Sequence, residues 1–205
     1  MLPFYAFYLL AQFRETRACP LIVAFFSLPD ATLLNVTGDF VTEDLGRVLA
    51  SVCGGEIAPM QQLIENPQVN EYARAAALDA IVTLVVEESI PRETAIAYFR
   101  TLFQTGLERT YSFAWDSLVS KSTKLYPEEL LPEIQQAFAD HRIDETYIDL
   151  PWVEHTLAEG KTATLAHLQR DRHYHFIKDV ISELEWWACF RPVSYTHLRA
   201  HETVL

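Results

Sequence analysis

Prolines that recur at a similar spacing place the strongest constraint on how this chain can fold. Pro20, Pro59, Pro91 and Pro127 stand 39, 32 and 36 residues apart, and each precedes a run with helical apolar spacing. Proline is tolerated in the first turn of a helix, because its missing N–H has no partner there and its φ is already helical. This period, with two helices in each unit, predicts an all-α fold, a HEAT- or armadillo-like α-solenoid of helical hairpins. The alternative is an irregular helical bundle, which has the same apolar stripes.

The runs between the prolines show how those helices are expected to pack. After Pro91 and again after Pro127, apolar residues follow one shared helical spacing, which is typical of an amphipathic helix with a single buried face. Asn70 is expected to cap a further helix whose broad stripe is rich in alanine, so that neighbouring helices approach it closely. Arg74 and Asp79 are assigned to the wetter side of this helix.

Composition excludes several classes of protein. The chain has 205 residues, of which 50% are hydrophobic and 21% charged, which excludes a disordered or low-complexity chain. The net charge of −12 disfavours nucleic acid and anionic membranes as partners, because binding to them depends on clustered cations. No window reaches the ~18 apolar residues of a membrane span, so no membrane partner is expected. Cys19, Cys53 and Cys189 are far apart and lack ligand spacing, which favours reduced thiols and a cytoplasmic protein.

The C-terminal end resembles a sequence foreign to the natural protein. It reads VSYTHLRAHET over 193–203, which is one translation of the transposase adapter used in tagmentation sequencing libraries. We therefore expect a single HEAT-like helical-repeat domain over 1–192 that is truncated at both ends. A non-native tail follows it over 193–205. His197 and His201 of that tail are accordingly set aside as metal ligands.

Four segments carry a resemblance to an uncharacterised bacterial family of HEAT-like proteins. They read FYAFYLLAQFRE at 4–15, GD and TEDL at 38–45, LIEN at 63–66 and YARAAAL at 72–78. The resemblance implies a HEAT-like fold and brings no established activity. Some members of that family carry a C-terminal SEC-C motif, a short Cys-rich zinc-binding segment that is absent from this sequence. No cofactor is therefore expected within 1–192, and zinc is assigned only to a missing C-terminal segment.

One segment has a spacing that can chelate a metal. Asp171, His175 and Asp179 recur every four residues, with Glu183 one step further, so on a helix they share one face. Helical zinc and di-iron sites use such a spacing, together with ligands from other helices. The alternative is a solvated helical face with i, i+4 pairing. A metal-binding protein or a metal-dependent enzyme is therefore an alternative to the function concluded below.

The same region holds the candidate contacts with a macromolecular partner. A small basic and aromatic cluster contains Arg170 and Arg172, with His173 and Lys178, around Tyr174, the arrangement expected of a nucleic-acid-associated factor. Trp186 and Trp187 are candidate anchors for a protein partner, because tryptophan is enriched in binding hot spots. The other two tryptophans, Trp115 and Trp152, are interpreted as core residues, and the paired acids Glu87-Glu88 and Glu128-Glu129 as water-facing.

No motif of a hydrolase or nucleotide-binding enzyme is present in the sequence. It contains no GxSxG, no HExxH and no P-loop, and its 6 glycines leave little material for a phosphate-binding turn. No catalytic residue is therefore assigned, and the balance is against an enzyme. The sequence favours a non-enzymatic protein-interaction or scaffold module of the bacterial cytoplasm, whose protein partner it does not identify. The metal-binding and nucleic-acid hypotheses above are its alternatives.

Overall fold

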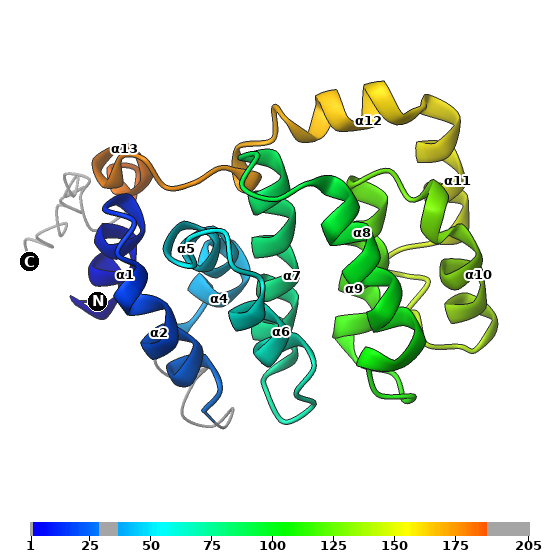
Figure 1. The fold of residues 1–205 in the computed structure, drawn as a ribbon, viewed down its shortest axis with the longest axis horizontal. Coiled ribbons are helices and arrows are strands. Elements are labelled where there is room, and N and C mark those ends of the chain that lie inside the picture. Colours follow the sequence, from blue (N-terminus) through cyan, green and yellow to red (C-terminus); the bar gives the residue numbers. More distant parts are fainter. Residues whose placement is uncertain (1, 29–36, 188–205) are drawn as a thin grey trace, which may run out of the picture.

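The computed structural model describes residues 2–28 and 37–187, and in this part of the chain every regular element is a helix (Figure 1). The all-α prediction is thereby confirmed. Cys189 and the 193–205 tail lie outside the described residues. The longer helices are α1 (Leu2–Gln12), α2 (Cys19–Phe26), α4 (Phe40–Glu43), α5 (Leu45–Val52), α6 (Ala58–Ile64), α7 (Glu71–Val86), α8 (Arg92–Thr101), α9 (Phe113–Lys124), α10 (Leu131–Ala139), α11 (Leu150–Glu159), α12 (Lys161–Leu168) and α13 (Val180–Leu184). The short turns are η1 (Thr16–Ala18), η2 (Leu102–Gly106, a π-helix), η3 (Glu128–Leu130) and η4 (Arg172–Tyr174).

The described helices between α1 and α10 stand beside one another in a row, with α7 near its centre (Figure 1). The alanines of α7 are buried, and α7 packs against α5, α6 and α9. A Cβ atom at Gly46 of α5 would lie 2.7 Å from the Cβ of Asp79 and 2.9 Å from the carbonyl oxygen of Ala76. Helix α5 therefore crosses α7 at a distance that only glycine permits. None of the described helices is long and apolar enough to cross a bilayer.

The expected helix starts are largely confirmed. Pro20 and Pro59 occupy the first turns of α2 and α6, and the Oδ1 of Asn70 caps α7 by accepting the N–H groups of Tyr72 and Ala73. Pro91 stands one position earlier than expected, as the N-cap of α8. Its fixed φ still directs the chain into the helix.

Buried arginines tie successive parts of the row together. The guanidinium of Arg74, whose side chain is 2% exposed, donates two hydrogen bonds of 2.7 and 2.6 Å to the carboxylate of Glu108, which lies 34 residues later. Arg92 contacts Glu129, 37 residues on, in the same two-pronged way, with both bonds at 2.7 Å. The assignment of Arg74 to the wetter side of α7 is therefore wrong. Its Nε also donates to the carbonyl of Ile64 at 2.9 Å, so the end of α6 and Glu108 together make burial tolerable.

The last part of the described chain turns back across the row. Residues 169–187, which we call the strap, run from α12 along one edge of the row to α13, which lies against α1 (Figure 1). The strap contains η4, a non-helical stretch over 175–179, and α13. The backbone N–H of Val180 donates to Oε1 of Gln12 at 2.7 Å, so the strap joins the last described helix to the first.

The tryptophans divide between core and surface. Trp115 is buried, as expected, and its indole N–H donates to the carbonyl of Glu108 at 2.9 Å. The core interpretation of Trp152 is wrong, because this residue is 59% exposed. It lies on α11, at the outer end of the row, where few later elements are available to cover it (Figure 1).

Candidate functional site

The strap is held to the end of α7 by one carboxylate. Glu87 lies 2.8 Å from Nδ1 of His175, and it accepts the N–H of Phe176 at 3.1 Å and the Nζ of Lys178 at 3.2 Å. Burial acts to raise the pKa of Glu87, but these hydrogen bonds lower it overall. The prediction that Glu87 and Glu88 both face water is therefore wrong for Glu87, whose side chain is 13% exposed.

Both ring nitrogens of His175 are engaged in holding the strap. Nδ1 faces the carboxylate of Glu87, and Nε2 lies 2.9 Å from the carbonyl oxygen of Gln169. Each ring nitrogen therefore faces an oxygen atom of the protein, and His175 acts as a contact between the strap and α7.

The acids of the expected metal stripe act as helix caps. Asp171 accepts the N–H of His173 at 3.2 Å at the start of η4, and the Nζ of Lys124 lies 3.1 Å from it. Burial acts to raise the pKa of Asp171, while these two bonds lower it overall. Asp179 caps α13 by accepting the N–H of Ile181 at 3.0 Å. Each carboxylate satisfies backbone N–H groups that a helix start leaves unpaired.

The prediction of one helical face bearing Asp171, His175 and Asp179 is therefore wrong. The chain is helical only in η4 and α13 on either side of the non-helical 175–179 stretch, so a four-residue period no longer aligns side chains. Within residues 2–28 and 37–187 no group of three or more His, Cys, Asp or Glu side chains is placed to hold a metal ion.

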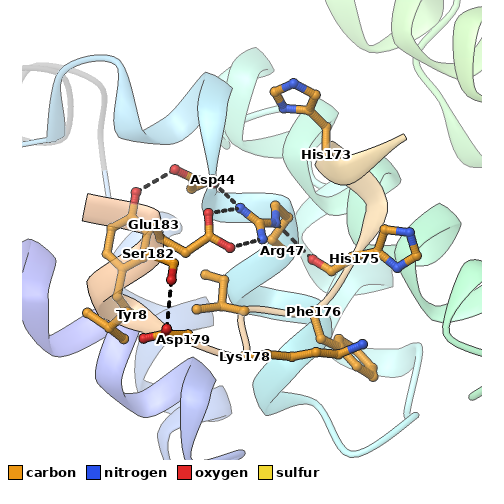
Figure 2. Close-up of polar contacts among 12 residues, drawn as sticks. Tyr8, Asp44, Arg47, His173, His175, Phe176, Lys178, Asp179, Ser182 and Glu183 are labelled. Atoms are coloured by element: carbon orange, nitrogen blue, oxygen red, sulfur yellow. Dashed lines mark hydrogen bonds and ion pairs between the residues drawn. The ribbon is translucent and has the colours of Figure 1, made fainter. Parts of the chain in front are cut away.

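A second anchor of the strap is the guanidinium of Arg47 on α5 (Figure 2). Its Nε donates to the carbonyl of His175 at 2.8 Å, its Nη1 and Nη2 donate to Glu183 at 2.9 and 2.5 Å, and Nη1 also contacts Asp44 at 3.0 Å. The hydroxyl of Tyr8 on α1 donates to the other oxygen of Asp44. Burial acts to lower the pKa of Arg47, but its two carboxylates raise it overall. Elements from both ends of the described chain therefore meet at one buried cation.

A third anchor joins the strap to α9. The Nζ of Lys121 lies 2.7 Å from Asp79 and 3.2 Å from the hydroxyl of Tyr174, whose ring is buried. The aromatic ring of the predicted nucleic-acid cluster is therefore inaccessible for stacking on a base. Arg170 and Arg172, which both precede Tyr174 in the chain, are exposed.

The second and third anchors line a pocket of ≈ 550 Å³ between the strap, α4, α5, α7 and α9. Its floor contains the buried residues Gly46, Arg47, Ala76 and Tyr174, with the partly buried Lys121 and Asp79 beside them. Its exposed rim consists of Thr42, Glu43, Arg172, His173, Ser182 and Trp186. We call this space the strap pocket. A volume of this size fits a small molecule or a few side chains of a partner.

The two tryptophans of α13's C-terminal side have different environments. Trp186 is 53% exposed on the rim of the strap pocket. Trp187 is partly buried, with its ring 6.3 Å from that of Tyr5 and 5.9 Å from that of Tyr8. Trp187 therefore fastens the strap to α1, and Trp186 is the indole presented to solvent.

Two charged side chains on the rim have no interaction within the described residues. Glu43 and Arg172 are exposed and take part in no side-chain hydrogen bond or ion pair among residues 2–28 and 37–187. The charges beneath them, Arg47 and Lys121, are already neutralised by carboxylates. The rim therefore provides the charges that a ligand can meet.

Sequence reasoning identified Trp186 and Arg172 on this rim but missed the residues that build it. Arg47 and Glu183 are 136 residues apart, and His175 and Glu87 are 88 apart, so no local pattern links either pair. For the buried ion pairs of the row, such as Arg74 with Glu108 and Arg92 with Glu129, the sequence offers one signal, which is an Arg followed by a Glu about one repeat later.

Comparison with known proteins places the chain in a family. The model of the family described as "Protein of unknown function (DUF1186)" matches residues 1–191. The chain belongs to this family. An uncharacterized protein of Chlamydia trachomatis serovar D is 45% identical over 183 residues, which are 89% of this chain and 72% of the relative. An uncharacterized protein of Chlamydia muridarum is 43% identical over 183 residues, with 89% and 73% covered. No solved structure matches this DUF1186 chain significantly.

Proposed function

We propose that this member of the DUF1186 family is a non-enzymatic protein-interaction module that binds a segment of a partner protein at the strap pocket. The observation that carries the proposal is the exposed indole of Trp186, at 53% exposure, on the rim of a ≈ 550 Å³ pocket. Large exposed aromatic side chains next to a pocket are typical of protein-binding hot spots.

The chemistry of the floor supports binding rather than catalysis. A general acid, base or nucleophile needs a group that is free to exchange protons or attack a substrate. In the strap pocket, Arg47 is bonded to Asp44 and Glu183, and Lys121 is bonded to Asp79. These groups hold the strap in place and are already occupied in doing so.

The repeated ion pairs support a HEAT-like array as the scaffold of this site. Arg74, Arg92 and Arg100 reach glutamates 34, 37 and 33 residues later, which is close to the spacing of the four prolines. Stacked helical hairpins contact only their neighbours, so ties at one repeat length are expected of them. In this proposal the strap is an addition that crosses the array. Free, buried Cys19 and Cys53 support a reducing, cytoplasmic setting.

Site-specific photo-crosslinking tests the proposal. A photoreactive phenylalanine analogue replaces Trp186 in the full chain. The matched control carries it at Ile181, which is exposed in the preceding helix α13 but does not line the pocket. We expect a discrete protein adduct from position 186 and none from 181. The captured protein, once purified, should bind the unmodified chain and lose about tenfold in affinity for Trp186→Ala.

Two results would contradict the proposed function. One is an adduct pattern that is the same at positions 186 and 181. The other is a purified partner whose affinity is unchanged by Trp186→Ala, which would place its binding surface elsewhere on the chain.

A further inference from the structure

The two walls of the strap pocket differ in charge. One wall is formed by α4 and α13 and carries three acids, Glu43, Asp44 and Glu183. Arg47 forms ion pairs with Asp44 and Glu183 but not with Glu43. The other wall is η4, which presents Arg172 and His173. Figure 2 shows His173 on one side of Arg47, with Asp44 and Glu183 on the other. The pocket therefore has an acidic end and a basic end.

The acidic end has the groups that bind a cation. Trp186 extends from the C-terminal side of α13 with half of its surface exposed, and Glu43 has no partner among the described residues. An indole face attracts Lys and Arg side chains through its quadrupole, and a nearby carboxylate adds a charge pair. The net charge of −12 also attracts basic segments over longer distances.

The basic end has the groups that bind a carboxylate. Arg172 has no partner among the described residues, and a guanidinium fork matches a carboxylate in two hydrogen bonds. Lys121 also lines the pocket and contacts Asp79 and the hydroxyl of Tyr174, which belongs to η4 like Arg172. The closed strap fixes both ends relative to each other, because Arg172 and Trp186 belong to the same anchored segment.

From this geometry we propose that the strap pocket binds a peptide segment with a basic side chain at the Trp186 and Glu43 end and an acidic side chain at the Arg172 end. This inference rests on the proposed function and adds the chemistry of the partner to it. The segment enters with its backbone along the strap, and the opposite charges set its direction. Reversing the order of the two charges places like charges together at both ends, which opposes binding.

Selection from random dodecapeptides displayed on phage tests the proposal with a defined probe. The full chain is immobilised, and peptides retained by the bare support are removed before the selection. We expect the enriched peptides to carry Lys or Arg at a fixed separation from Asp or Glu. Synthesised versions should bind the unmodified chain about tenfold more tightly than Trp186→Ala, as measured by isothermal titration calorimetry.

Charge reversals at the rim then test each end separately. Glu43→Lys should weaken the selected peptide about tenfold, and a peptide with its basic residue changed to Glu should recover most of the loss. Arg172→Glu should do the same for the acidic residue of the peptide. Glu185→Lys and Arg170→Glu are matched controls, because both residues are exposed near the pocket but do not line it. We expect each control to change the affinity by less than about twofold.

The outcomes separate this inference from the proposed function. Peptides that depend on Trp186 but respond equally to rim and control reversals would overturn the charge assignment and leave the binding site in place. If no peptide is enriched while crosslinking at position 186 still captures a protein, the linear-segment inference is wrong and the interaction module stands. Enriched peptides that bind Trp186→Ala unchanged would contradict both.

Discussion

Removing the charge of Glu108 should reduce the free energy of unfolding more than removing the charge of an acid whose partner is exposed. Its carboxylate takes two hydrogen bonds from the guanidinium of Arg74, at 2.7 and 2.6 Å, and that side chain is 2% exposed. In Glu108→Gln the cation stays buried without its counter-charge. Breaking a buried pair by removing one partner destabilises by about 3 to 5 kcal/mol. For a chain of this length, that loss corresponds to a fall in melting temperature of roughly 6 to 20 °C.

Urea denaturation followed by circular dichroism measures this loss, and a second tie of the same kind is its control. Arg100 contacts Glu133 at 3.1 Å, but the arginine side chain is 40% exposed, so water screens the pair. Glu133→Gln should therefore reduce the free energy of unfolding by less than about 1 kcal/mol. The double variant Arg74→Met/Glu108→Gln should be more stable than Glu108→Gln alone, because no unpaired charge remains. Equal losses for Glu108→Gln and Glu133→Gln would refute the reasoning.

Three further predictions follow from particular contacts. Burial acts to raise the pKa of Glu108, but its bond with Arg74 lowers it to about 2 from the usual 4.5, so this pair stabilises the fold above pH 4.5 and the contribution is lost as the pH falls toward 2. Urea midpoints measured across that range should fall less steeply for Glu108→Gln than for the unmodified chain, and equal slopes would contradict this. Gly46→Ala should reduce the unfolding free energy by about 1 to 3 kcal/mol, because the new Cβ would lie 2.7 Å from another side chain; an unchanged thermal melt would show that α5 and α7 separate freely. His175→Phe should speed amide hydrogen exchange over 170–180 without changing exchange in the middle of α7, and unaltered exchange in the strap would mean that other contacts hold it.

The helices of this fold could be predicted from local sequence because their determinants are local. Pro20, Pro59 and Asn70 act within one helical turn of their own position, and the structure places all three in the first turn or at the cap of a helix. The apolar spacing after Pro91 likewise concerns one face of one helix. Such signals establish the class of fold without showing which helices are in contact.

The strap pocket could not be predicted in the same way, because its contacts join distant residues. The four-residue spacing of Asp171, His175 and Asp179 resembles a helical stripe, whereas Asp171 and Asp179 cap two short helices and His175 pairs with Glu87. The two capping residues, Asp171 and Asp179, are eight residues apart, and His175 falls midway between them, which produces the apparent four-residue period. The sequence assigns Arg74 to the wrong side of its helix for a related reason, because a charged residue on a helix is expected in water unless its buried partner is known.

The central claim is that the strap pocket, marked by Trp186, is where a partner segment binds, and the indole N–H signals of the chain test it most directly. The chain has 4 tryptophans, so a two-dimensional ¹⁵N spectrum resolves one signal for each, and Trp186→Phe identifies the signal of interest. On titration with a selected dodecapeptide, the account predicts a saturable shift of the Trp186 signal and no shift of buried Trp115. A peptide that binds while the Trp186 signal stays unchanged, or while only the signal of exposed Trp152 moves, would contradict it.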